Sequence, residues 1–354
     1  MKKLMLIATL ISLLLVSLAG CGASMDGVYE GGDNVQNMAP GAESPMEGGL
    51  PAQDADTPTF AENPFFATQE EAVSTFSADV DTASYTYFRK LVNSNYSFGE
   101  MVEKGSSFRT EEFLNYFKYQ ANAPQGGELF GVKAAIADCP WNPNTVLMSL
   151  TLQAEEAVPE GGNNLVFLID VSGSMSSSDK LPLLKKAFSY LVTQLTAEDR
   201  VSIVTYSGKE EVVLSGCPGN QGEKIMEAIN RLAANGSTNG EAGLQEAYRV
   251  AEENRIEGGN NRIIMASDGD LNVGISSDEE LKSFVEQKRE QGTYLSVLGF
   301  GIGNYRDSKM ETLADNGNGV YYYIDGESEA ERIFGSELFS TLYTVANDVK
   351  LQIT

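Results

Sequence analysis

The sequence LVFLIDVSGS, which occupies residues 165–174, decides the fold class of this chain. Its first five residues are all apolar, and an apolar run this short is typical of a strand that is buried on both faces. Asp170 follows the run, and the sequence Ser-Gly-Ser comes after Val171. The sequence therefore predicts a buried strand that presents polar side chains at its carboxyl end.

Short apolar runs of the same kind recur along the chain. They are found at residues 165–169, 201–206, 212–214, 263–266, 294–300 and 320–324. Apolar residues at helical spacing separate most of them, at residues 184–195, 225–233, 244–251 and 281–285. This alternation predicts an α/β fold with a doubly wound, mostly parallel sheet. Such sheets bind ligands beyond the carboxyl ends of their strands, so a functional site is expected there.

Oxygen-bearing side chains follow these predicted strands. Asp170, Ser172 and Ser174 come after the first strand, and Asp268 comes after the strand at 263–266. Thr238 lies on a glycine-flanked loop between them in the sequence. Carboxylate and hydroxyl oxygens with few charges suit a hard divalent cation better than Zn²⁺. The sequence therefore predicts a site for Mg²⁺ or Mn²⁺.

The Asp-x-Ser-x-Ser string, the later Thr and the later Asp resemble the metal-ion-dependent adhesion site of von Willebrand factor type A (VWA) domains. The resemblance implies a Rossmann-like fold. It also implies that Ser172, Ser174 and Thr238 are direct or near-direct metal ligands, and that Asp170 and Asp268 act largely through water. The family leaves one coordination position open, which implies binding of a protein partner that offers an Asp or Glu, without catalysis.

The composition excludes several other functions. The 354 residues carry 50 Asp and Glu against 25 Lys and Arg, a formal charge of −25, and contain no histidine. Without an imidazole there is no Ser-His-Asp triad and no histidine-ligated zinc. A chain this acidic does not suit nucleic acid, which is bound through basic surfaces. We therefore expect no nucleic-acid partner.

The N-terminal residues are typical of an export signal. Two lysines precede an apolar run at residues 4–16, which is too short to span a membrane. The sequence LAGC at residues 18–21 resembles a bacterial lipobox, which implies a signal peptide at 1–20 and lipidation of Cys21. The alternative is a plain secreted protein. The resemblance predicts a lipoprotein of the bacterial cell envelope that is anchored to a membrane and faces outside the cytoplasm, with inner or outer membrane left open.

A wider resemblance completes the domain organisation. The sequences FSADVDTASY, CPWNP and ASDGDLNVG, at residues 76–85, 139–143 and 266–274, resemble a group of bacterial lipoproteins with an N-terminal extension, a VWA domain and a further C-terminal domain. Residues 21–62 lack Lys, Arg and any periodicity, which is typical of disorder. The predicted order is an acidic disordered tether at 21–62, an N-terminal region at 63–160, the VWA domain at 161–335 and the start of a truncated β domain at 336–354.

The N-terminal region at 63–160 is rich in aromatic residues. Helices are expected at 82–92 and 110–119, and strands at 129–137 and 145–154. The second strand is predicted to point these side chains inward: Val146, Met148, Leu150 and Leu152. Helical spacing favours a buried set of rings over a platform for cell-wall glycan: Tyr85, Phe88, Phe113, Tyr116 and Phe117.

Two other functions remain open alternatives. In the first, the metal stabilises the loops of a structural scaffold that binds its partner through the aromatic N-terminal region. In the second, the sequence DVDT at 79–82 forms the nucleophile loop of a haloacid dehalogenase-like Mg²⁺ phosphatase, with Asp79 at its centre. The mixed sequence before this loop favours a different role, in which Asp81 is the N-cap of the following helix.

Two cysteines remain after the lipidated one. Cys139 lies between the two strands of the N-terminal region, and Cys217 lies in the predicted VWA domain. A disulfide between them and two free thiols are both compatible with an exported protein.

Overall fold

The computed structural model describes residues 65–354 with the exception of residues 104–107, 156–160, 237–239, 270–277, 303–306, 342–344 and 347–348. The predicted signal peptide, the lipidation site Cys21 and the predicted tether lie outside the described residues. Thr238 also lies outside them. The predictions made for these residues therefore stay predictions.

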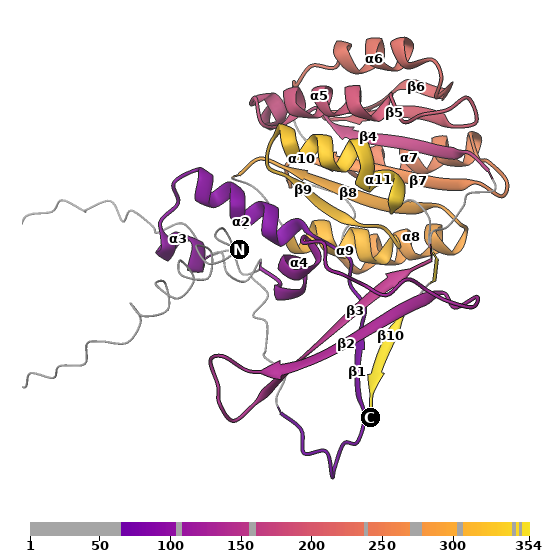
Figure 1. Cartoon of the computed structure of the whole chain (residues 1–354). Coiled ribbons are helices and arrows are strands. Elements are labelled where there is room, and N and C mark those ends of the chain that lie inside the picture. The colour runs from indigo at the N-terminus through magenta and orange to yellow at the C-terminus, as the bar shows by residue number, and fades with distance from the viewer. Residues whose placement is uncertain are drawn as a thin grey trace, which may run out of the picture. The chain divides into compact units, whose positions relative to one another are not determined.

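A six-stranded sheet forms the centre of the described fold (Figure 1). In chain order its strands are β4 (Asn163–Asp170), β5 (Arg200–Tyr206), β6 (Glu210–Pro218), β7 (Asn260–Ser267), β8 (Tyr294–Phe300) and β9 (Tyr321–Ile324). Their order across the sheet is β6-β5-β4-β7-β8-β9. Neighbouring strands are parallel except for β5 and β6. The predicted α/β fold with a mostly parallel sheet is confirmed.

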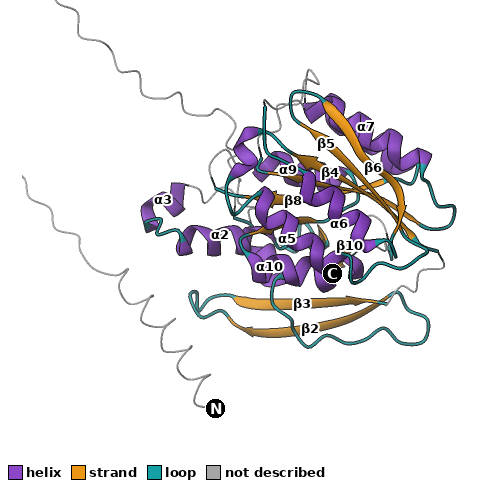
Figure 2. Ribbon diagram, turned by 90° about the horizontal axis from the view of Figure 1, so that it is seen from above, coloured by secondary structure: helices purple, strands orange, loops and turns teal. Residues whose placement is uncertain are grey.

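Helices cover both faces of this sheet. They are α5 (Leu181–Leu191), α6 (Gly222–Arg231), α7 (Gly240–Glu253), α8 (Asp278–Glu290), α9 (Asp307–Asn316) and α10 (Glu327–Arg332), which continues through the π-helical turn η3 (Ile333–Glu337) into α11 (Leu338–Ser340). Alternate residues of β4 serve the two faces: Phe167 packs in the core that contains α5 and α6, and Leu168 packs in the core that contains α7. Figure 2 shows α5, α6 and α10 on one side of the sheet and α7 on the other.

The first N-terminal helix, α2 (Ala83–Asn93), docks against β9. Arg89 forms ion pairs with Asp325 at 2.5 Å and with Glu329 at 2.9 Å. These two carboxylate side chains are only 8% and 2% exposed, so the ion pairs lie within the interface. The N-terminal region is thus joined to the sheet by charged as well as apolar contacts.

The prediction that Asp81 is the N-cap of α2 is wrong. The N-cap residue is Thr82, and its side chain makes no capping hydrogen bond. The Asp81 carboxylate instead accepts a hydrogen bond at 2.9 Å from the backbone N–H of Tyr321. Tertiary contact with the start of β9 therefore replaces the local capping interaction.

The aromatic residues of this region pack against one another between α2 and α4 (Thr110–Asn115), with α3 (Phe98–Glu103) between these helices in the chain. The ring of Tyr85 lies 5.7 Å from Phe113, 4.3 Å from Tyr116 and 5.0 Å from Phe117. Most of these rings are partly buried, and Phe117 is 48% exposed. The set is therefore a half-buried cluster built from two helical segments.

Two separate antiparallel pairs of strands complete the described elements. The strand β1 (Ser74–Ser77) pairs with β10 (Lys350–Ile353), and β2 (Phe130–Asp138) pairs with β3 (Val146–Ala154). The inward orientation predicted for β3 is wrong for its first half, because Val146 is 65% exposed and Met148 is 44% exposed. A two-stranded pair has a hydrophobic interior only where a further layer covers it, and no described element covers this half of β3.

Both described cysteines are free thiols. Cys139 is buried at the turn between β2 and β3, and Cys217 is buried in β6. The structure does not contain the disulfide that was one of the two alternatives.

Candidate metal site

The sheet brings the two predicted metal-site aspartates to the same edge. Strands β4 and β7 are parallel neighbours in which Ile169 pairs with Ala266. Asp170 is the last residue of β4, and Asp268 directly follows β7. Both side chains are buried, with residue exposures of 0% and 2%. The carboxyl ends of the central strands therefore carry two buried carboxylates, in the position where parallel sheets bind ligands.

The loop after β4 folds back on itself through short hydrogen bonds. The backbone N–H of Ser172 donates to Asp170 Oδ1 at 2.8 Å. The loop then turns into the 3₁₀ helix η2 (Gly173–Ser176), which places Ser172 Oγ 2.9 Å from Ser174 Oγ. Ser172 is 2% exposed. The spacing of two residues between Asp170, Ser172 and Ser174 thus gathers their side chains at one place.

The loop that leads to Thr238 runs beside this one. The backbone N–H of Gly173 donates to the Gly236 carbonyl at 3.1 Å, and the N–H of Asn235 donates to the Val171 carbonyl at 2.7 Å. Gly236 has a φ of +85°, which a residue with a side chain rarely adopts. These contacts hold residues 235–236 against the loop after β4, whereas Thr238 lies outside the described residues.

Burial and charge repulsion perturb the ionisation of Asp170. Loss of solvent on burial is the largest effect, and together with the nearby charge of Asp268 it raises the pKa of the Asp170 carboxyl from 3.8 to about 6. Hydrogen bonds from Ser172 and from the Ser267 hydroxyl, which lies 3.4 Å from Asp170 Oδ2, oppose this rise. A cation bound close to Asp170 would therefore relieve an unfavourable buried charge.

One cationic side chain does reach the site. Lys180 Nζ lies 2.7 Å from Asp268 Oδ2 and donates a hydrogen bond to the Ser174 carbonyl at 3.0 Å. Sequence analysis missed Lys180, because a lysine just before a helix gives no local sign of contact with an aspartate 88 positions later.

The donor set fits a hard divalent cation. It consists of the carboxylates of Asp170 and Asp268 and the hydroxyls of Ser172 and Ser174, all of which are oxygen donors. Across the described ranges, no group of three or more His, Cys, Asp or Glu side chains is arranged to hold a metal ion. A metal at this place would therefore depend on the serine hydroxyls as well as on the carboxylates.

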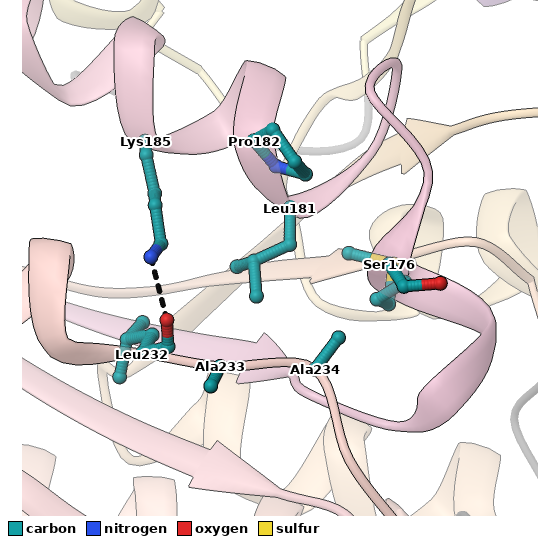
Figure 3. Close-up of a pocket in the computed structure, with 8 residues that line it drawn as sticks. Ser176, Leu181, Pro182, Lys185, Leu232, Ala233 and Ala234 are labelled. Carbon is teal, nitrogen blue, oxygen red and sulfur yellow. Dashed lines mark hydrogen bonds between the residues drawn. The ribbon is translucent and has the colours of Figure 1, made fainter.

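A shallow hollow lies beside the loop that carries the serines (Figure 3). Its volume is about 190 Å³, and its lining residues are Met175, Ser176, Leu181, Pro182, Lys185, Leu232, Ala233 and Ala234. Lys185 closes one side by donating a hydrogen bond at 2.5 Å to the Leu232 carbonyl. The hollow is therefore lined by the residues that follow Ser174 and by residues 232–234, which precede Asn235 and Gly236 in the chain.

The alternative site at Asp79 lacks the structural context of a phosphatase. A nucleophile loop of that class follows a buried strand, whereas β1 is exposed along its length and antiparallel to β10. Asp79 Oδ1 accepts a hydrogen bond from the backbone N–H of Asp81 at 3.1 Å, and Asn115 donates to Asp79 Oδ2 at 3.3 Å. The loop is thus part of the contact between α2 and α4.

Comparison with known families agrees with the fold. The profile of the von Willebrand factor type A domain matches residues 164–336, and a second profile, described as von Willebrand factor, matches residues 52–149. The chain is therefore a VWA domain protein, with the VWA domain built around the six-stranded sheet.

Particular relatives span different parts of the chain. The Escherichia coli (strain K12) protein YfbK, described as uncharacterized, is 40% identical over 303 residues, which are 83% of this chain and 52% of YfbK. Human inter-alpha-trypsin inhibitor heavy chain H3 is 29% identical over 187 residues, which are 50% of this chain and 21% of that protein. The chain thus spans about half the length of YfbK and less of the human protein.

Solved structures include similar folds at lower identity. A von Willebrand factor type A structure from Catenulispora acidiphila has a TM-score of 0.45 and 20% identity, and covers 64% of this chain and 51% of that chain. The proximal thread matrix protein 1 from the mussel byssus, with a zinc-occupied MIDAS motif, has a TM-score of 0.42 and 22% identity, and covers 51% of this chain and 46% of that chain. Among the described helices of the present protein, none has the length and apolar character that crossing a membrane requires.

Proposed function

We propose that this protein binds a protein partner through a divalent cation, Mg²⁺ or Mn²⁺, held at the carboxyl ends of β4 and β7. The residues that would hold the cation are Asp170, Ser172, Ser174, Thr238 and Asp268. The observation that carries the proposal is the meeting of two buried carboxylates and two serine hydroxyls at one edge of a VWA sheet. The cation would supply a Lewis-acidic position for an Asp or Glu of the partner.

The residues of the chain prepare this position in different ways. Asp170 holds the Ser172 backbone by a hydrogen bond of 2.8 Å, which keeps the loop in its tight turn. Ser172 and Ser174 present adjacent hydroxyl oxygens, and Asp268 supplies the second negative charge.

The cellular location forms the second part of the proposal. We propose that the chain is exported, lipidated at Cys21 and held at the cell envelope by the tether at 21–62. An apolar run after two lysines and the lipobox-like sequence at residues 18–21 support this assignment. A metal-dependent binding domain on a tether would then face partners outside the cytoplasm.

Isothermal titration calorimetry of the metal-stripped protein with Mg²⁺ and Mn²⁺ tests the metal site. We expect saturable binding at one site, and its loss in Ser172→Ala. The matched control is Ser189→Ala, because Ser189 lies exposed on α5 and its hydroxyl bonds only the preceding turn at Lys186. Equal binding by both variants would overturn the assignment of the site.

Partner binding requires a second experiment. A partner captured by the wild-type protein in Mg²⁺ should be released by EDTA and should not be captured by Ser172→Ala. If EDTA leaves the partner bound, the metal only stabilises the loops, and binding through the aromatic N-terminal region is the better explanation.

A further inference from the structure

Lys180 occupies a position inside the proposed metal site that the family resemblance does not assign to any residue. Its ammonium lies 2.7 Å from Asp268 Oδ2 and 3.0 Å from the Ser174 carbonyl oxygen. The Lys180 side chain is 14% exposed and that of Asp268 is 1% exposed, so water screens this ion pair only weakly. The Lys180 ammonium therefore belongs to the site rather than to the surrounding surface.

The fold holds the lysine in this place. Its backbone N–H donates to the Ser177 carbonyl at 3.1 Å, in the turn that begins α5. The side chain then passes Gly301, which has a φ of +73°, and a Cβ at Gly301 would overlap the Lys180 Cε. A residue with a side chain after β8 would therefore displace the lysine from Asp268.

Among the residues that the structure describes, three charged side chains set the charge of the site. Asp170, Asp268 and Lys180 have a formal sum of −1, whereas the two aspartates alone have −2. A divalent cation would bring the three groups to +1, and one carboxylate from a partner would bring them to zero. Without the lysine, the aspartates and a divalent cation would already be neutral.

We propose that Lys180 is a specificity-determining residue of this site, which weakens binding of the metal alone and leaves the loaded site with one positive charge for a partner carboxylate. The inference rests on the proposed metal-dependent binding and extends it to the chemistry of the partner. Its physical basis is the repulsion between an ammonium and a divalent cation that share a buried carboxylate as neighbour. Metal and partner would then bind cooperatively. The bound metal leaves a positive charge that favours the partner carboxylate, and the bound carboxylate in turn stabilises the metal.

The first test is calorimetric titration of metal-stripped full-length protein with Mn²⁺. Lys180→Met keeps the apolar length of the side chain and removes its charge, and we expect Mn²⁺ to bind at least about tenfold more tightly than to wild type. The matched control is Lys186→Met in α5, the helix that follows Lys180, since Lys186 is 62% exposed and pairs with Glu327 at the surface. This variant should bind Mn²⁺ within about twofold of wild type.

Lys180→Gln and Lys180→Arg keep the test valid if Asp268 does not tolerate an apolar neighbour. Gln keeps a hydrogen-bond donor without charge and should also bind Mn²⁺ more tightly, whereas Arg keeps the charge and should not. Equal or weaker Mn²⁺ binding by the neutral variants would overturn the inference and leave the proposed function intact. Absence of Mn²⁺ binding by wild type and variants alike would overturn both.

The second test measures attraction of a carboxylate directly. Acetate is added at one concentration to each protein saturated with Mn²⁺, and chloride keeps the ionic strength constant. The relaxation rate of the acetate methyl protons is then compared between the proteins. We expect wild type and Lys186→Met to enhance this relaxation several times more than Lys180→Met does. Equal enhancement by all three proteins would contradict the role of Lys180 in selecting a carboxylate.

Discussion

Replacement of Asp170 by Asn is expected to stabilise the metal-free protein while it removes metal binding. The amide oxygen can still accept the hydrogen bond that the Ser172 N–H donates to Oδ1 at 2.8 Å. The Ser267 hydroxyl, 3.4 Å from Oδ2, can rotate to accept from the new amide group. The substitution therefore removes a buried charge without leaving an unsatisfied partner.

The magnitude follows from the perturbed ionisation of Asp170. Burial, with repulsion from Asp268, raises the pKa of this carboxyl from 3.8 to about 6. Each pKa unit corresponds to about 1.4 kcal/mol, so the ionised carboxylate costs the folded protein about 3 kcal/mol near neutral pH. Because the folded pKa is raised, the stabilisation by the protonated form is complete below about pH 4 and is lost as the pH rises through about 6.

Urea unfolding in EDTA at several pH values measures this effect. Near pH 7.5 the Asp170→Asn protein should be more stable than wild type by about 3 kcal/mol, and the difference should shrink toward about pH 4. Addition of Mg²⁺ should stabilise only the wild type. A variant that is less stable than wild type in EDTA near neutral pH would refute the reasoning.

Asp199→Asn is the matched control for this prediction. Asp199 is also buried, at 3% exposure, but its two carboxylate oxygens accept hydrogen bonds from the backbone N–H groups of Asn163 and Thr196. An amide would oppose one of these donors with another donor, so this variant should lose stability at the same pH.

Three further outcomes are expected. Thr238→Ala should weaken Mg²⁺ binding in calorimetry less than Ser172→Ala does, and complete loss in the Thr238 variant alone would contradict this ranking. Arg89→Met should lower the free energy of urea unfolding by about 3 kcal/mol, because it removes the ion pair of the buried Asp325 carboxylate. Arg231→Met, in an exposed helical pair, should lower it by less than about 0.5 kcal/mol. Equal losses would show that the Arg89 pairs add nothing. Asp81→Asn should flatten the pH dependence of the unfolding midpoint in EDTA. Burial raises the pKa of Asp81 well above 3.8, so the stability that the protonated carboxyl contributes is lost as the pH rises. An unchanged slope would assign that dependence to other groups.

Much of the VWA domain could be predicted because its signals are local. The apolar run at 165–169 marks β4, and Asp170 and Ser172 follow it within three residues. A parallel sheet buries its central strands on both faces, so β4 and β7 each contain a continuous apolar run that is easy to recognise. The same rule places ligand-binding residues at the carboxyl ends of the strands.

The elements outside the sheet were harder to predict because they lack this periodicity. The strand β1 at Ser74–Ser77 is exposed along its length and pairs with β10, so nothing in its own sequence identifies it. Asp81 was expected to cap a helix, a local role, but its carboxylate contacts the backbone of Tyr321, which lies 240 positions later. Such long-range pairings depend on which surfaces meet during folding, and a short stretch of sequence does not encode that choice.

The candidate metal site contains both local and long-range contacts within a few residues. Asp170, Ser172 and Ser174 come together because a strand end, a glycine and a spacing of two residues bring them onto one turn, which is a local property of the chain. The pairing of Lys180 with Asp268 depends on the register of β4 beside β7 and on the space that Gly301 leaves for the lysine side chain. Contacts between elements far apart in sequence form only when the sheet is assembled, so the charge of the site, unlike its ligand types, is decided by tertiary packing.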